Sequence, residues 1–303
     1  MIKNISVIYN PISGKGQAKH LAENHIIKFL EKNGFNTQLF QSKKNPQEYI
    51  NEISNFNSCD LIIVIGGDGT LLGLLPLLPQ TQIPVYMIPA GNESLFAQIY
   101  HMDRDENLLL QAIKENKLKT QYYGIISNQD FTLPFFCMAS MGLDSLTVKY
   151  IGERSGAINN FKYIWYGLKA LINFSNPIVS IKADGVEIVS KENGYLIVAN
   201  SSSYAHDLRL VPHASPDLNH LDLAFLPNSN RWDEIKKGIW MAQRKQAKLP
   251  LQYFTAKQFE ITIHENDFPL QVDGEYFQNK DIPAERKITF KMADKPIQVL
   301  TIK

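Results

Sequence analysis

The chain has 303 residues, 44% hydrophobic and 20% charged, which is the balance of a soluble globular protein long enough for two domains. Its 31 Lys and Arg residues nearly equal its 30 Asp and Glu residues, so its overall charge does not favour nucleic acid as a partner. The only cysteines, Cys59 and Cys137, are far apart, which argues against a disulfide framework and indicates a reducing compartment.

The first third of the chain alternates strand and helix patterns. The run DLIIVI at 60–65 is apolar throughout, as expected for a parallel strand covered on both faces. The order of the elements predicts a doubly wound α/β domain over residues 1–122. Strands are predicted at 5–10, 35–40, 60–65 and 83–89, and helices at 16–34, 46–54 and 70–75.

From about residue 120 the pattern changes to short strands separated by turn residues. Two helices, near 156–174 and 231–247, interrupt these strands. We expect a mainly antiparallel β-sandwich domain over residues 123–303 that leaves a cleft against the first domain, and its last strand is a candidate to return to that domain. The strands are predicted at 120–127, 132–140, 177–190, 194–202, 221–227, 259–265 and 269–277.

Three glycines and one aspartate end the most apolar strand, in VIGGDGTLLG at 64–73. Gly66, Gly67 and Gly69 would let a phosphate approach the backbone, just before a helix that starts near Thr70. A carboxylate repels phosphate unless a hydrated Mg²⁺ lies between them, so Asp68 favours a nucleotide–metal complex. The alternative is an ordinary Asx turn before the helix, with no ligand.

A second loop of phosphate-binding type follows the first strand, in NPISGKG at 10–16. It does not match the Walker A sequence. Asn10, Ser13, Gly14 and Lys15 nevertheless offer amide, hydroxyl and ammonium groups between a strand and a helix. Taken alone, this loop would be better explained as a solvated turn. It supports phosphate binding because it is the second loop of this type on one sheet edge.

Several segments recur in a fixed order along nearly the whole chain. They are IYNPISGKG (8–16), GGDGT (66–70), IPAGNESLFA (88–97), MGLDS (141–145), GAINNFKYIWYGLKAL (156–171), the block from VANSSS to NHLDL (198–223) and QVDGE (271–275). Together they resemble the diacylglycerol kinase-like catalytic family, which includes sphingosine and ceramide kinases and many bacterial lipid kinases. GGDGT alone is shared with NAD kinases, so the ordered set carries the resemblance.

The resemblance implies an NAD kinase-like nucleotide-binding domain followed by a β domain, with the lipid acceptor between them. ATP phosphates would bind at Gly66–Thr70, at the Asn10–Lys15 loop and at Asn92. Asp68 would act in a network of Mg²⁺ and water, and Asp144 would face the same cleft.

The resemblance also places the general base at Asp273 or Glu275, in QVDGE. Two carboxylates around Gly274 in an apolar setting would disfavour each other's charge, which makes either a better proton acceptor near neutrality. We expect Glu275 to be the base and Asp273 to orient the acceptor hydroxyl or the metal waters. Without the upstream motifs, an Asp-Gly hairpin turn would be the preferred interpretation.

The sequence departs from the family pattern at three places. Asn92 replaces a threonine and can still donate a hydrogen bond to a phosphate. Leu95 stands where many members have an aspartate, which removes one carboxylate from the metal network. Leu218 and Asn219 replace an Asp-Gly pair, so a structural Mg²⁺ at this block would depend on Asp217.

The segment 231–250 combines an apolar stripe with basic residues. We expect its apolar face to pack on the β domain. Docking of its basic face on anionic lipid is the alternative function. The apolar stripe is Trp232, Ile235, Ile239 and Ala242, and the basic residues are Lys236, Lys237, Arg244 and Lys248.

The sequence therefore predicts an ATP- and Mg²⁺-dependent lipid kinase that phosphorylates a hydroxyl of a diacylglycerol-like or sphingoid-like lipid. An NAD kinase-like enzyme and a catalytically impaired nucleotide- or lipid-binding relative are the alternatives. The N-terminus lacks a signal-peptide pattern, and the apolar runs fall short of the roughly 20 residues of a membrane span. We expect a cytoplasmic protein with peripheral contact to an anionic membrane at its inner face, and no nucleic-acid partner.

Overall fold

The computed structural model describes residues 2–43, 48, 59–90, 94–129, 131–142, 145, 176–202, 210–228, 230–243, 245–264, 270–277 and 287–302. The helices predicted at 46–54 and 156–174 lie outside these residues, apart from Glu48. The chain divides into two compact units. Unit 1 is Met1–Gln121 with Asp294–Lys303, and unit 2 is Tyr122–Ala293.

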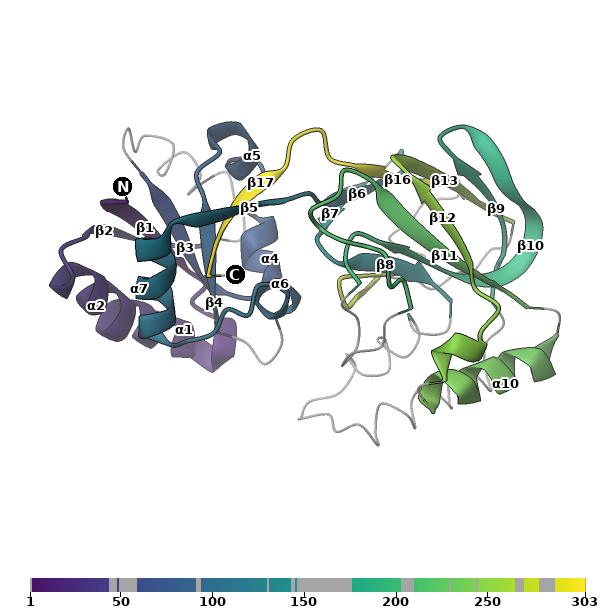
Figure 1. Cartoon of the computed structure of the whole chain (residues 1–303), viewed down its shortest axis with the longest axis horizontal. Helices are drawn as coiled ribbons and strands as arrows, with labels where there is room; N and C mark the ends of the chain where they lie inside the picture. The colour runs from purple at the N-terminus through teal and green to yellow at the C-terminus, as the bar shows by residue number, and fades with distance from the viewer. Residues whose placement is uncertain are drawn as a thin grey trace. The chain divides into compact units, whose positions relative to one another are not determined.

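Unit 1 is built on a six-stranded sheet with the strand order β2-β1-β3-β4-β17-β5 (Figure 1). The strands from β2 to β4 are parallel, and the C-terminal strand β17 runs parallel to β4 and antiparallel to β5. The bounds are β1 (Asn4–Tyr9), β2 (Asn36–Gln41), β3 (Leu61–Gly66), β4 (Val85–Pro89), β5 (Lys117–Gln121) and β17 (Ile297–Thr301).

Helical segments connect these strands. The predicted helix at 16–34 is present as α1, η2 and α2, with a π-helical turn in η2. The sequence reasoning missed α7, where the Asp105 side chain accepts a hydrogen bond from the Asn107 amide at the start of the helix. The bounds are η1 (Ser13–Gly16), α1 (Gln17–Leu21), η2 (Ala22–Ile26), α2 (Ile27–Lys32), α4 (Asp68–Leu72), α5 (Leu78–Thr81), α6 (Leu95–Ile99) and α7 (Glu106–Glu115).

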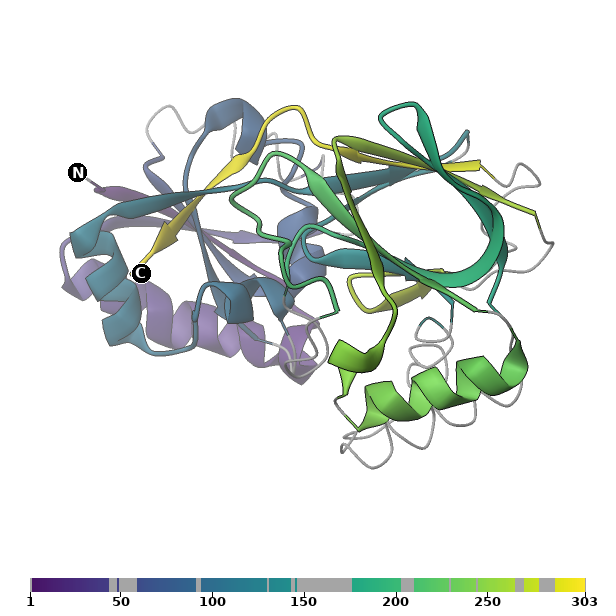
Figure 2. The same cartoon turned by 45° about the vertical axis from the view of Figure 1, so that its right-hand side comes forward.

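Unit 2 is an antiparallel sheet that curls around a hydrophobic core (Figure 2). The long strand β10 pairs with β9 along its first half, where the register shifts, and with β8 and β11 along its second half. The bounds are β6 (Gly124–Ser127), β7 (Thr132–Phe135), β8 (Met138–Met141), β9 (Ile178–Ala183), β10 (Val186–Ala199), β11 (Leu221–Pro227), α10 (Arg231–Ala242), η3 (Gln246–Lys248), β12 (Gln252–Ala256), β13 (Gln258–Ile263), β14 (Leu270–Val272), β15 (Glu275–Phe277) and β16 (Lys287–Met292).

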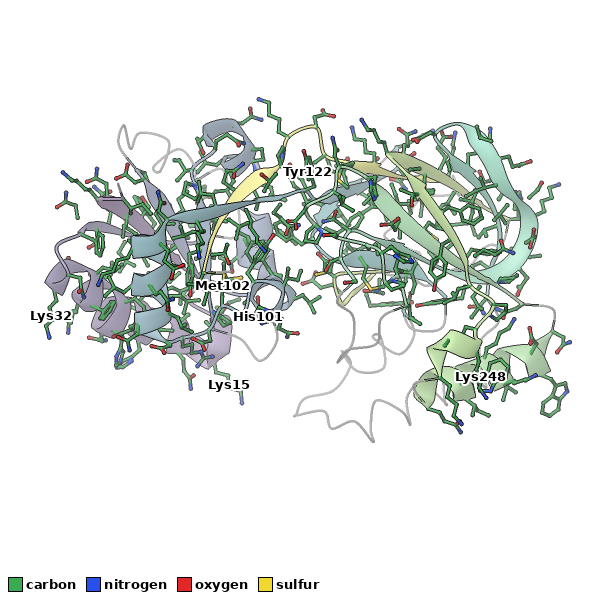
Figure 3. All side chains as sticks on the ribbon, viewed as in Figure 1. Lys15, Lys32, His101, Met102, Tyr122 and Lys248 are labelled. Atoms are coloured by element: carbon green, nitrogen blue, oxygen red, sulfur yellow. The ribbon has the colours of Figure 1, made fainter. Side chains whose placement is uncertain are left out.

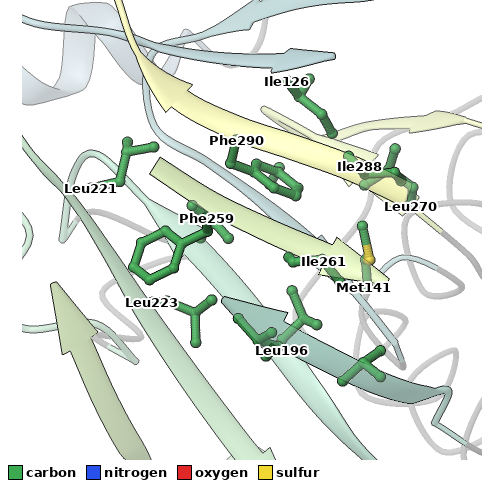
Figure 4. Packing of buried hydrophobic residues seen from close by; sticks show 14 of the residues in the cluster. Ile126, Met141, Leu196, Leu221, Leu223, Phe259, Ile261, Leu270, Ile288 and Phe290 are labelled. Atoms are coloured by element: carbon green, nitrogen blue, oxygen red, sulfur yellow. The ribbon is translucent and has the colours of Figure 1, made fainter. Parts of the chain in front are cut away.

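The core of unit 2 comes from the inward-facing side chains of this curled sheet. Figure 4 shows Phe259 and Ile261 of β13 among residues from the neighbouring strands. Alternation along β13 places Phe259, Ile261 and Ile263 in the core, as the sequence predicts. The predicted fold class, an α/β domain followed by an antiparallel β domain, is confirmed.

Two predicted single strands are hairpins in the structure. The run 177–190 turns at Asp184 and Gly185, and the run 269–277 turns at Asp273 and Gly274. Both residues of each turn have positive φ, at 45° and 86° in the first and 47° and 84° in the second. Positive φ at both residues is typical of a type I′ turn, for which Asp-Gly is a strong signal. The hairpin alternative stated for Asp273–Gly274 is therefore present, whereas the same signal at Asp184–Gly185 was passed over.

The orientation predicted for α10 is wrong. Trp232 and Ile239, expected to face the sheet, are 81% and 39% exposed. Lys237, expected on a solvated basic face, is buried and pairs with Asp233. None of the helices that the structure describes is both long and apolar enough to cross a membrane.

Candidate active site

The glycine loop follows β3 at the carboxyl edge of the unit 1 sheet. A Cβ atom on Gly66 would lie 2.6 Å from Thr70 Oγ1, so packing against α4 requires glycine at this position. At Gly67 and Gly69, by contrast, an added Cβ would meet no atom of the described residues within 4 Å, and neither residue has a left-handed φ. The described part of the fold therefore does not require these two glycines, and the open space beside them suits a ligand that comes close to the backbone.

The backbone amides of this loop point to the charge of such a ligand. The Thr70 amide donates to the Gly67 carbonyl at 3.0 Å. For the amides of Gly67, Asp68 and Gly69, no backbone acceptor occurs among the described residues. Amides that have no backbone acceptor among the described residues, at the turn from a parallel strand to a helix, favour an anion, and a phosphate fits this requirement.

The first loop is joined to the glycine loop. Asn10 directly follows β1, its amide donates to the Ile65 carbonyl at 3.0 Å, and its side chain donates to Thr70 Oγ1 at 3.2 Å. A Cβ on Gly14 would lie 2.2 Å from the Ala90 carbonyl oxygen, so the loop also packs against the end of β4. The structure thus brings the two predicted phosphate loops together at one sheet edge.

Lys15 lies at the exposed tip of this first loop. Its φ is 57°, unusual for a residue with a side chain, and it stands between Gly14 and Gly16, which also have positive φ. The side chain extends away from the unit 1 sheet (Figure 3). A strained backbone that presents an exposed ammonium group on a loop joined to the glycine loop is compatible with phosphate binding.

Asp68 binds the start of α6. Its Oδ2 accepts from the Leu95 amide at 2.8 Å, and its Oδ1 accepts from the Phe96 amide at 3.1 Å and from the Ser94 hydroxyl at 2.9 Å. A carboxylate at a helix N-terminus satisfies amides that have no acceptor within the helix. The capping alternative is therefore present, although the helix that Asp68 caps is α6 and not its own helix α4.

Asp273 holds a turn in unit 2. Its Oδ2 accepts from the Phe136 amide at 2.6 Å, and its Oδ1 accepts from the Cys137 and Met138 amides, both at 2.9 Å. These amides belong to the turn between β7 and β8 and to Met138, the first residue of β8. Asn200 binds the same turn by donating its side-chain amide to the Phe136 carbonyl at 3.0 Å. Sequence reasoning did not single out Asn200 or this turn.

Glu275 begins β15, on the other side of the Asp273–Gly274 turn, and its side chain is exposed. The buried Gln271 side chain accepts from the Gly274 amide at 2.9 Å, which fixes the turn between the two carboxylates. The apolar carboxylate pair expected from the sequence is therefore wrong: Glu275 is solvated, and the Asp273 carboxylate is occupied by backbone amides.

Of the remaining predicted ligands, the structure describes only Asp217. Asn92 and Asp144 lie outside the described residues. Asp217 is exposed in the loop before β11. Among the side chains that the structure describes, no three His, Cys, Asp or Glu residues are grouped so as to hold a metal ion.

A pocket of about 510 Å³ opens next to the phosphate loops in unit 1. The Arg104 side chain in its wall donates to the Pro89 carbonyl at 2.7 Å. Nearby, burial and the negative charges of Asp103 and Asp105 raise the pKa of Tyr86 to about 12. No sequence motif marks this pocket, which is lined by Pro89, Ser94, Ala97, Gln98, Met102, Asp103, Arg104 and Asp105.

Comparison with known proteins decides the family. Residues 4–124 match the diacylglycerol kinase catalytic domain, and residues 137–293 match the YegS C-terminal NAD kinase beta sandwich-like domain. The chain belongs to the diacylglycerol kinase family. As a member it is a lipid kinase, which transfers a phosphate group from ATP to an alcohol group of a lipid.

Curated relatives of this kinase extend over most of its length. A diacylglycerol kinase of Staphylococcus carnosus (strain TM300) is 26% identical over 91% of this chain and 90% of its own. A diacylglycerol kinase of Staphylococcus aureus (strain MRSA252) is 27% identical over 91% of this chain and 87% of its own. The match of residues 4–124 to a diacylglycerol kinase catalytic domain, together with the names of these relatives, favours a lipid kinase over an NAD kinase.

A solved structure shows the same fold. The crystal structure of a diacylglycerol kinase from Bacillus anthracis str. Sterne superposes with a TM-score of 0.66 at 16% identity, and covers 99% of this chain and 97% of that chain. At this identity the likeness concerns the fold, so the roles of individual residues in the kinase depend on the contacts described above.

The described residues of the kinase fit the phosphates of ATP. The open space at Gly67 and Gly69, the amides beside it and the adjacent loop of Asn10 and Lys15 supply the required donors and room. Both Asp68 oxygens already accept hydrogen bonds, so this carboxylate fits a contact with Mg²⁺ through water better than a direct bond.

Proposed function

We propose that the ATP phosphates bind across the two joined loops of unit 1, Asn10–Lys15 and Gly66–Thr70. The observation that carries this proposal is the pair Gly67 and Gly69, whose missing side chains the described part of the fold does not require. The hydrogen bond from Asn10 to Thr70 holds the loops side by side, so one nucleotide contacts both. Asn92, two residues before the Ser94 that Asp68 binds, is a further phosphate donor in this proposal.

Mg²⁺ would arrive with the nucleotide and neutralise charge on the transferring phosphoryl group. In this proposal Asp68 does two things. It fixes the start of α6 through the Leu95 and Phe96 amides, and it orders waters of the hydrated ion. Asp144 and Asp217 are further candidate metal ligands.

Unit 2 would hold the lipid acceptor and supply the base. Glu275 is exposed and free to accept the proton of the acceptor hydroxyl as the new bond to phosphorus forms. Asp273 would act as a positioning residue, because its carboxylate is engaged by three amides of the turn between β7 and β8 and the start of β8. The two carboxylates of QVDGE would then have different tasks, set by their different surroundings.

The acceptor would be a diacylglycerol-like lipid, as the names of the relatives suggest, and a sphingoid base is the second candidate. The kinase would work in lipid metabolism in the cytoplasm, where ATP is available, and contact the inner face of an anionic membrane. This contact is peripheral in the proposal.

One assay tests the proposal. The protein is incubated with γ-labelled ATP and Mg²⁺ and offered, in separate reactions, dioleoylglycerol in detergent micelles, sphingosine or NAD. Label in phosphatidic acid is the expected result, and label in sphingosine phosphate would change the acceptor class. Label in NADP would establish the NAD kinase alternative. Transfer to none of the three, with ATP still bound, would establish a catalytically impaired relative.

A further inference from the structure

The outer side of α10 carries an aromatic and an aliphatic residue with a lysine between them. Trp232 is 81% exposed, Ile239 is 39% exposed and Lys236 is exposed. Spacings of four and seven residues place all three on one side of a helix. We call Trp232, Lys236 and Ile239 the α10 outer face. Figures 1 and 2 show α10 as a separate layer outside the curled sheet of unit 2.

The attachment of α10 to unit 2 uses a charged residue. Lys237 is 6% exposed, and its ammonium group donates to the Pro227 carbonyl and to Asp233, with Asn228 Oδ1 at 3.4 Å. A helix on the surface of a water-soluble domain normally turns its apolar residues inward and its lysines outward. Here a lysine is buried, while a tryptophan and an isoleucine face outward. The outer face is therefore suited to contact with a membrane or another protein surface rather than with water alone.

The charged residues near the α10 outer face indicate which surface it would contact. Lys236, Lys245 and Lys248 are exposed, and Lys248 lies in η3 next to α10 (Figure 3). Asp233 pairs with Lys237, and the side chain of the other acidic residue of this helix, Glu234, lies outside the described residues. The Lys236 ammonium lies 4.8 Å from the centre of the Trp240 ring, so its charge is held at the helix surface. An exposed tryptophan with an exposed lysine on the same side of the helix, and further lysines beyond its C-terminal end, match the interface of an anionic bilayer, where indole rings and basic side chains both bind.

We propose that the α10 outer face docks the kinase on an anionic lipid bilayer. The Trp232 ring would lie at the level of the headgroups, Ile239 would enter the edge of the acyl region, and the three lysines would contact lipid phosphates. The proposal rests on the proposed function, because a kinase whose acceptor has two acyl chains must meet that acceptor in a membrane. It replaces the predicted basic face, since Lys237 is buried and does not reach a lipid.

Sedimentation with vesicles tests the docking directly. Vesicles are made of phosphatidylglycerol and phosphatidylcholine in equal parts, and of phosphatidylcholine alone. We expect binding to the anionic vesicles that weakens with salt, and a loss of about fivefold for Lys236→Gln, the effect of one basic residue near such a surface. Trp232→Ala should lose at least as much. Val186→Ala, which removes an equally isolated residue that is 68% exposed in a distant hairpin, should bind like the parent protein.

A second measurement separates the docking from catalysis. Trp232→Ala should keep its turnover on a short-chain diacylglycerol dissolved as monomers, and lose turnover on dioleoylglycerol within anionic vesicles. If the parent protein binds vesicles in this manner but phosphorylates neither lipid, the proposed function fails and the docking stands. Unchanged vesicle binding by Trp232→Ala and Lys236→Gln would overturn the docking. So would conversion of a dimer to a monomer by Trp232→Ala, because the face would then join two copies of the chain.

Discussion

Replacement of Asp273 by asparagine distinguishes a positioning carboxylate from a general base. In the structure Oδ1 accepts from the Cys137 and Met138 amides and Oδ2 accepts from the Phe136 amide. Asparagine keeps one oxygen, and its NH₂ group would face the Phe136 N–H as a second donor. It also tolerates the positive φ of 47°, so backbone strain is not introduced.

The expected loss of stability in Asp273→Asn can be estimated from these contacts. One charge-assisted hydrogen bond is lost, one amide is left without its acceptor, and the other two bonds lose the help of the negative charge. Together these changes should lower the free energy of unfolding by about 2–4 kcal/mol. For a unit of the size of residues 122–293, this corresponds to a fall in Tm of roughly 4–16 °C.

Thermal unfolding and turnover are measured on the same preparations. Asp273→Asn should lower Tm, and it should lower kcat through a displaced Glu275 while leaving the KM for ATP unchanged. Asp184→Asn is the matched control: Asp184 begins the other Asp-Gly hairpin turn and accepts from the Lys257 and Gln258 amides, at 3.3 and 2.9 Å. It should reduce stability less and leave turnover unchanged. An Asp273→Asn protein with the parent Tm and abolished turnover would refute the positioning role and make Asp273 the base.

Three other substitutions test the remaining assignments. Glu275→Gln should lower kcat by roughly 10² or more with the parent Tm and KM for ATP, because a solvated base has few structural contacts; normal turnover would remove Glu275 as the base. Asp68→Asn should abolish phosphoryl transfer. It should also lower the free energy of unfolding by about 1–3 kcal/mol, because the asparagine NH₂ group would face an amide of α6. An unchanged melting curve would contradict the capping role of Asp68. Gly67→Ala should fold normally and raise the KM for ATP, whereas Gly14→Ala should be destabilised because its Cβ would lie 2.2 Å from a carbonyl oxygen. Equal stability of these two alanine variants would show that the open space at Gly67 has another cause.

Local patterns predicted the architecture of unit 1 and the place of its loops. The apolar run at 60–65 has the composition of a strand covered on both faces, and β3 is buried along its length. Glycines after β1 and β3 marked the two sheet-edge loops, because parallel strands end at a common edge. The turns at Asp184–Gly185 and Asp273–Gly274 were also readable, since Asp-Gly between two apolar runs is a hairpin signal.

Contacts between distant segments could not be predicted. Asp68 meets amides 27 and 28 residues away, and Asp273 meets amides more than 130 residues away, with no local pattern that marks either pairing. The orientation of α10 was mistaken for the same reason. Helical periodicity assigns Trp232 to an apolar stripe, but the Pro227 carbonyl and Asp233 together satisfy a buried ammonium group, so the helix turns Lys237 inward.

The partners of Asp68 also explain how the kinase accommodates Leu95. This leucine stands where the family pattern has a carboxylate, yet its contact with Asp68 is made by its backbone amide, at 2.8 Å. Any residue with an N–H group at this position would make that bond, so the glycine loop and α6 stay joined. In the proposed site, the loss would be limited to one negative charge near the phosphates. Because Mg²⁺ keeps several waters when it binds with a nucleotide, the phosphate oxygens together with a water-mediated contact to Asp68 would be enough to hold it. The geometry at Leu95 therefore supports an active lipid kinase over an impaired relative.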